Sequence, residues 1–313
     1  VWASCEAAGA GPEALPNLGG ELVDAGSSFV GTMRDAAQAW RDRVRPVAHA
    51  LDGVSNLVVI PSGPMLGIPV GTLVDGHGLL LGESYSVTYA PSAAVFTWLR
   101  EKGTADPGRE ELPALLLVGD PPFDPSHLES MTADPAPRGD DAAATSRTGR
   151  NAASFQRLGA SRAEVALISE LTPESTVLLG PAASEQTLVE LASSGELAAF
   201  DAVHIATHAI VDDERPERSS LVLCQVGLPD PLEAALSESR IYDGFLTAEE
   251  IVREWELDAD LVTLSACETA LGRRVVGEGY IGFAHAFLQA GARSLLVGLW
   301  RVDDEATSLL MRR

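Results

Sequence analysis

Short apolar runs alternate with amphipathic segments along the second half of the chain. The runs have the length of buried strands, and the segments between them carry apolar residues at helical spacing. The expected strands are 115–118, 176–179, 202–206, 221–224, 261–264 and 294–300, and the expected helices are 161–171, 184–198, one beginning near Thr247, and 278–290. Buried strands that alternate with helices predict an α/β fold with a mostly parallel sheet flanked by helices. In such sheets, active groups gather beyond the carboxyl ends of the strands.

The first half of the chain has a weaker pattern. Apolar residues at near-helical spacing across 22–51 predict one or two helices. Strand-type runs at 57–60 and 85–89 are separated by the Gly- and Pro-rich segment 61–78, which predicts a hairpin-like β unit. A helix is expected from Pro91 to about Glu101.

A change of composition divides the chain. Residues 121–155 are rich in Asp, Pro, Ala, Ser, Thr and Arg, with few large apolar residues, which is typical of a flexible linker loop. We therefore expect an N-terminal α/β half over 51–120 and a second half over 156–313. The helical segment 1–50 is interpreted as the end of an upstream module.

The termini indicate a piece of a longer protein. The chain opens at Val1 without an initiator Met, and it stops at Arg313 inside a helical pattern, so we expect a truncated C-terminus.

Charge and cysteine content exclude several functions. With 45 acidic and 22 basic side chains, the formal charge is −23, which repels a phosphate backbone and favours basic peptides over nucleic acid. No apolar run approaches the roughly 18 residues of a membrane span. The 3 cysteines form no CxxC pair, so neither a disulfide framework nor a metal site is expected. We expect a cytoplasmic protein without cofactor, membrane or nucleic-acid partner.

Two segments place reactive side chains just past expected strands. His208 follows the strand 202–206, and Cys267 follows the strand 261–264. If these strands are neighbours, the imidazole can take and return a proton while the thiolate attacks a carbonyl carbon. The chemistry predicted is acyl transfer.

Each of these residues also has a structural interpretation. A cysteine considered alone is most often a buried structural residue, but Cys267 lies beyond its strand and precedes a polar turn and Gly272, which favours the nucleophile. Cys224 and Cys5 are interpreted as structural or incidental. His204, inside its strand, is expected to be packed or hydrogen-bonded.

The sequence resembles the CHAT domain family through motifs that occur in the order typical of that family. These motifs are HIATH at 204–208, LSACETALG at 264–272, GEGYIGF at 277–283, AGARS at 290–294 and LWRVDDEAT at 299–307. CHAT domains resemble caspases and separase, so the resemblance implies a caspase-like sheet preceded by a pseudo-caspase-like α/β half. The similarity extends from about residue 50 to the end of the chain.

The resemblance also implies roles for individual residues. Cys267 would be the nucleophile of a cysteine endopeptidase and His208 its general acid/base. The backbone N–H groups of Cys267 and Ala209 would stabilise the oxyanion. The family usually has Gly where this chain has Ala209, and alanine resists a positive φ.

The resemblance implies a substrate pocket with a basic preference. Similarity to the separase segment after the catalytic cysteine indicates Asp304, then Asp303, as the counter-charge for a substrate Arg or Lys. The alternative is that these acids are the first turn of a helix, stabilised by its dipole. Ser265 and Trp300 complete the expected pocket. Metacaspase-like relatives have Asp where this chain has Ser265, so that route to basic specificity is absent.

The linker contains three arginines at which an enzyme of basic specificity could cleave itself: Arg138, Arg147 and Arg150. The alternative is a tolerated insertion without a role.

These features predict a caspase-like endopeptidase acting on a protein or peptide substrate and gated by an upstream regulatory module or activator. CHAT domains are commonly fused to tetratricopeptide or other sensing modules. The rival is a catalytically silent scaffold or interaction module with the same fold. A small-molecule α/β-hydrolase needs a GxSxG or GxCxG elbow, and residues 265–269 do not form one.

Overall fold

A computed structural model gives the fold of the chain. The residues it describes are 36–60, 69–102, 112–131, 155–172, 174–212, 214–237, 240–266, 278–298 and 311. They belong to two compact units, which divide after Lys102. Each unit is described by itself.

The first unit contains a two-stranded parallel sheet. Its elements are η1 (Arg45–Leu51), β1 (Asn56–Val59), η3 (Val70–Thr72), α3 (Leu81–Ser84), β2 (Ser86–Tyr89) and α4 (Ala93–Lys102). The hairpin-like pairing expected from the sequence is wrong, because β1 and β2 run parallel. Parallel strands need a crossover connection, and here it carries η3 and α3. Val70, Leu73 and Leu81 from this connection form the buried core of the unit.

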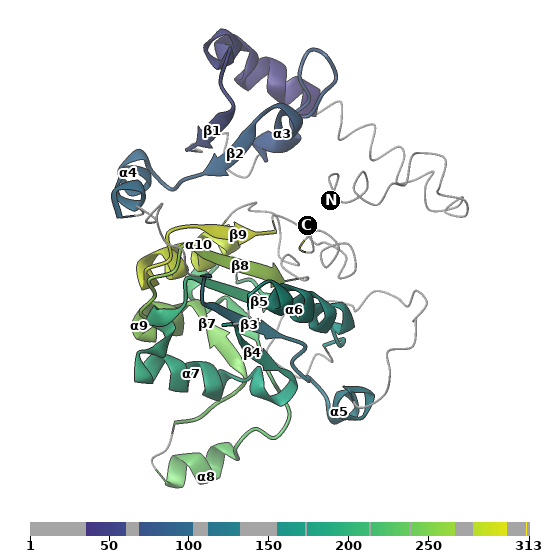
Figure 1. Ribbon diagram of the computed structural model, residues 1–313, viewed down its shortest axis with the longest axis vertical. Coiled ribbons are helices and arrows are strands. Elements are labelled where there is room, and N and C mark those ends of the chain that lie inside the picture. The colour runs from purple at the N-terminus through teal and green to yellow at the C-terminus, as the bar shows by residue number, and fades with distance from the viewer. Residues whose placement is uncertain are drawn as a thin grey trace, which may run out of the picture. The chain divides into compact units, whose positions relative to one another are not determined.

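The described residues of the second unit form a mostly parallel sheet of seven strands, shown in Figure 1. Its strands are β3 (Leu115–Gly119), β4 (Thr176–Leu179), β5 (Ala202–Ile210), β6 (Ser220–Val222), β7 (Phe245–Thr247), β8 (Leu261–Ala266) and β9 (Leu295–Val297). The parallel part has the order β4-β3-β5-β8-β9. The antiparallel pair β6 and β7 continues from the end of β5. The mostly parallel α/β sheet predicted from the sequence is confirmed.

Helices follow the strands as the alternation predicts. They are α5 (Pro125–Met131), α6 (Gly159–Leu171), η4 (Gly180–Ala182), α7 (Glu185–Ser194), η5 (Glu196–Ala199), η6 (Pro216–Arg218), α8 (Pro231–Leu236), α9 (Ala248–Glu254) and α10 (Glu278–Ala290). Helix α5 lies within the segment expected to be a flexible linker, whose residues 132–154 fall outside the described part. Among the described helices, none is both long and apolar enough to span a membrane.

The two faces of β5 have different chemical character because successive side chains of a strand point to opposite faces. Val203 and Ile205 belong to the large apolar core, together with Leu188 of α7 and Phe287 of α10. The intervening residue His204 faces α6, where it contacts a glutamate. Since His208 lies four residues further on, it shares the α6 face with His204.

Strand β5 is longer than the sequence predicted, so His208 lies inside the strand rather than after it. The extension forms because residues 208–210 pair with the antiparallel strand β6. The parallel neighbours stop earlier: the last pair with β3 is Gly119 with Ala206, and the last with β8 is Thr207 with Ala266. His208 is therefore the first residue of β5 beyond the carboxyl ends of both neighbouring strands.

Candidate active site at the carboxyl edge of the sheet

His208 is held in one orientation by a backbone carbonyl. Its side chain is buried, and its Nε2 atom lies 2.7 Å from the carbonyl oxygen of Gln156. A carbonyl oxygen only accepts hydrogen bonds, so Nε2 carries the hydrogen and donates it. In the neutral ring, Nδ1 is then the nitrogen that can accept a proton.

Two aromatic rings flank the imidazole. The ring centroid of Phe123 lies 5.0 Å from that of His208, and the ring of Phe155 lies 5.5 Å away. Phe155 in turn contacts Phe245 of β7 at 6.4 Å. These contacts restrict the plane of the imidazole while the Gln156 carbonyl sets its rotation.

A buried carboxylate lies directly after β3, beside the segment that bears Gln156. Asp120 is fully buried and accepts two hydrogen bonds from Arg157, at 2.9 and 2.7 Å, and one from Arg162 at 2.6 Å. Its backbone N–H donates to Ser161 Oγ at 2.9 Å. The hydrogen bond with the carboxylate raises the pKa of Arg157, so the guanidinium stays charged. Ion pairs of this forked geometry are directional as well as strong.

His204 is not part of this arrangement. Its Nε2 lies 2.7 Å from Oε1 of Glu164 on α6, and both side chains are buried. The prediction that His204 is packed or hydrogen-bonded is confirmed.

The predicted site residues divide between described and undescribed parts of the chain. Ser265 pairs with Ala206, so it lies on the α6 face of the sheet, two positions before the level of His208. Ala209 lies in β5 opposite Leu221, and its φ is not positive, since Asp120 alone among the described non-glycine residues has a positive φ. The remaining predicted residues fall outside the described part: Cys267, Trp300, Asp303, Asp304, Arg138, Arg147 and Arg150.

Cys224 has the environment of an inert cysteine. It is 3% exposed, its Sγ donates to the carbonyl oxygen of Val226, and burial raises the pKa of the thiol. A protonated thiol is a poor nucleophile. This agrees with the structural interpretation of Cys224.

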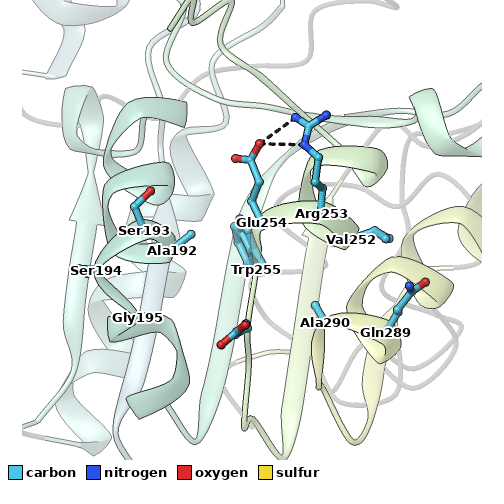
Figure 2. A pocket seen from close by; sticks show the side chains of 11 residues that line it. Ala192, Ser193, Ser194, Gly195, Val252, Arg253, Glu254, Trp255, Gln289 and Ala290 are labelled. Atoms are coloured by element: carbon cyan, nitrogen blue, oxygen red, sulfur yellow. Dashed lines mark hydrogen bonds and ion pairs between the residues drawn. The ribbon is translucent and has the colours of Figure 1, made fainter.

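An open surface groove lies elsewhere on the second unit. Figure 2 shows it between the ends of three helices, marked by Gly195 after α7, Trp255 after α9 and Ala290 in α10, with Arg253 and Glu254 hydrogen-bonded to each other. The end of α7 leads through η5 into the start of β5, whereas His208 lies near the other end of that strand. The groove is therefore separate from the candidate active site. Nor do the described residues contain a group of three or more His, Cys, Asp or Glu arranged to hold a metal ion.

Comparison with known families decides the classification. The sequence model of the CHAT domain, a caspase-like family, matches residues 33–313. The chain belongs to the CHAT domain family. No curated protein matches the chain.

Several residues around His208 in this CHAT domain have no role in the sequence interpretation. Phe123, Phe155 and Gln156 lie at the two ends of a segment of linker-like composition, where an isolated aromatic or amide residue carries no periodic signal. Asp120 is assigned no role from the sequence. Its position after a buried strand was the available signal, but its arginine partners follow some forty residues later in the chain.

Another buried carboxylate ties the β7 side of the CHAT domain to α7. Glu185 Oε2 accepts hydrogen bonds from the backbone N–H groups of Asp243 and Gly244 at 2.9 and 2.8 Å. Burial raises the pKa of Glu185 to about 7, the Gly244 N–H opposes the rise, and the charges of Glu250 and Asp243 add to it. Phe245, the next residue, contacts Phe155, so Glu185 anchors the loop beside the candidate active site.

The Glu185 carboxyl is expected to make stability depend on pH. Its pKa is raised from 4.5 to about 7, so the folded state binds the proton more tightly than the unfolded state. The stabilisation is present below pH 4.5 and is lost as the pH rises through 7. Between pH 5 and pH 8, the unfolding free energy measured by denaturant titration should fall. The fall should be smaller in Glu185→Gln than in wild type by roughly 1–2 kcal/mol. Glu190→Gln, at an exposed position of the same helix, is the control. An equal fall in unfolding free energy for Glu185→Gln and wild type would contradict the raised pKa of Glu185.

Proposed function

We propose that this CHAT domain is a cysteine endopeptidase in which His208 and Cys267 form the catalytic dyad. The observation that carries the proposal is the hydrogen bond from His208 Nε2 to the Gln156 carbonyl at the carboxyl edge of the sheet. It leaves Nδ1 as the base, on a ring held between Phe123 and Phe155.

The chain connectivity supports Cys267 as the partner of His208. Ala266, the last residue of β8, pairs with Thr207, the neighbour of His208. Consecutive Cα atoms lie about 3.8 Å apart. Covalent connectivity alone therefore keeps the Cα atom of Cys267 within that distance of Ala266, just as that of His208 is kept within that distance of Thr207. A thiol within hydrogen-bond reach of an oriented imidazole is the arrangement that nucleophilic catalysis needs.

The proposed reaction is hydrolysis through an acyl-enzyme. His208 Nδ1 takes the thiol proton of Cys267, and the thiolate attacks the scissile carbonyl carbon. The oxyanion accepts hydrogen bonds from the backbone N–H groups of Cys267 and Ala209. The imidazolium then protonates the leaving amine, and water, activated by the same imidazole, hydrolyses the thioester. Because Ala209 has an ordinary negative φ in the structure, its replacement of the usual Gly costs no backbone strain there.

The proposed substrate is a protein cleaved after a basic residue, with activity gated by an upstream sensor module. Asp304 and Asp303 supply the pocket charge, Ser265 and Trp300 line the pocket, and the formal charge of −23 attracts basic segments. Self-cleavage at Arg138, Arg147 or Arg150 remains a prediction. The second candidate is a catalytically silent scaffold, favoured by the burial of His208, which is 4% exposed.

Labelling with peptide acyloxymethyl ketones tests the proposal. A probe with Arg at the cleavage position is expected to modify Cys267 faster than a probe with Asp, as read by mass spectrometry of the labelled peptide. Labelling should disappear in Cys267→Ala and persist in Cys224→Ala, the control for the buried thiol. Modification of Cys267 by neither probe, in the full-length protein with its activator, would leave the scaffold as the better account. Preference for the Asp probe would remove the role of Asp304.

A further inference from the structure

The orientation of His208 depends on a carbonyl from a segment that belongs to no helix or strand. Gln156 lies between Phe155 and Arg157, just before α6 begins at Gly159. A backbone carbonyl can orient an imidazole only if its own peptide is fixed. The position of Gln156 therefore needs an anchor.

Asp120 supplies that anchor through the neighbouring residue. The Nε and Nη2 atoms of Arg157 donate to the two carboxylate oxygens, which is a forked, two-point contact. The side chain of Arg157 is 16% exposed and that of Asp120 is fully buried, so water competes little for this pair. Arg162 contacts the same carboxylate from a more exposed position, with 40% of its side chain accessible.

The backbone at Asp120 is also fixed to α6. The Asp120 N–H donates to Ser161 Oγ, and that hydroxyl donates to the carbonyl oxygen of Leu158 at 2.6 Å. Asp120 thus binds the chain on both sides of Leu158, once through Arg157 and once through Ser161.

The backbone conformation of Asp120 is uncommon for a residue other than glycine. Its φ of 47° lies in the left-handed region, which costs most residues with a side chain roughly 1–2 kcal/mol and costs aspartate less. Strained residues of this kind persist where the surrounding contacts determine them, and they cluster at functional sites. Asp120 follows Gly119, whose β-ladder partner Ala206 lies two residues before His208.

We propose that Asp120 is a positioning residue of the active site: by clamping Arg157 it holds the Gln156 carbonyl against His208 and keeps the imidazole in the tautomer with the hydrogen on Nε2. This role rests on the proposed function, since the tautomer matters for catalysis only if Nδ1 serves as the base. The orientation of the ring itself is independent of any activity.

Nuclear magnetic resonance of the histidine rings tests the clamp directly. In protein labelled with ¹⁵N-histidine, long-range proton–nitrogen correlations distinguish the two neutral tautomers, and the His208 signal is assigned by its loss in His208→Gln. Wild type is expected to show the Nε2–H form. In Asp120→Asn, which removes the charge and one acceptor, the ratio of tautomers should shift by about tenfold, the equivalent of one ordinary hydrogen bond.

Arg162→Gln is the matched control. It removes a contact to the same carboxylate but leaves both hydrogen bonds of Arg157, so the His208 tautomer should stay as in wild type. If Asp120→Asn does not fold, Arg157→Lys carries the test, because lysine retains the charge but not the fork. An unchanged tautomer in folded Asp120→Asn or Arg157→Lys would show that the cluster serves stability alone and overturn the proposal. A tautomer shift together with an unreactive Cys267 would support the clamp while contradicting the endopeptidase.

Discussion

Replacing His208 with alanine is expected to lower the rate of peptide cleavage by about 10³- to 10⁴-fold. In the proposed mechanism, His208 is both the base that deprotonates the thiol and the acid that protonates the leaving amine, and the residues of such a catalytic pair act as a unit. The loss should fall on kcat, measured with a fluorogenic peptide carrying arginine before the scissile bond. The Cys267→Ala variant should be equally inactive, and the double variant no worse.

His204→Gln is the control for His208→Ala. His204 lies four residues earlier on the same face of β5, but its partner is Glu164 and not the Gln156 carbonyl. We expect His204→Gln to lower thermal stability, because a buried hydrogen-bonded pair is altered, and to keep cleavage within a few-fold of wild type. If His208→Ala cleaves the peptide as fast as His204→Gln does, His208 is not the acid/base.

Replacing Gly291 with alanine is expected to give the largest loss of stability of any glycine substitution in the described second unit, about 3 kcal/mol or more. Gly291 ends α10 with a φ of 118°, a conformation that L side chains rarely adopt. A Cβ atom there would lie 1.9 Å from the carbonyl oxygen of Leu257, which belongs to the backbone and cannot rotate away. The free energy of unfolding, from denaturant titration, measures the effect.

Gly195→Ala separates the two components of that loss. Gly195 caps α7 with a φ of 79°, yet a Cβ atom there would meet nothing within 4 Å. Its substitution should cost only the left-handed backbone term, about 1 kcal/mol. Equal losses for Gly195→Ala and Gly291→Ala would mean that the contact with Leu257 relaxes, and that backbone conformation alone sets both values.

Elements whose side chains follow one clear period were predicted well. The strand 176–179 matches β4 residue for residue, and the helix expected over 278–290 matches α10. Gly291, which directly follows α10, has a positive φ, as expected of a glycine that ends a helix. These features depend on local spacing and on single residues with special backbone preferences, which one sequence displays directly.

Pairing between distant segments was predicted less well. The runs that became β1 and β2 were expected to form a hairpin, because strand-type residues do not encode whether two strands run parallel or antiparallel. The end of β5 was placed at Ala206, because the partner that extends it to Ile210 is β6, and a ladder depends on both of its strands.

The amino-acid sequence by itself determined the mostly parallel α/β sheet, the CHAT family and the candidate catalytic residues His208 and Cys267. The spacing of apolar residues and the family motifs can both be recognised in a single sequence. Only the tertiary structure decided what surrounds His208. The carbonyl of Gln156, the rings of Phe123 and Phe155 and the carboxylate of Asp120 come from segments up to some ninety residues away. No local pattern records such contacts, because their geometry exists only after the strands have paired and α6 has packed on the sheet.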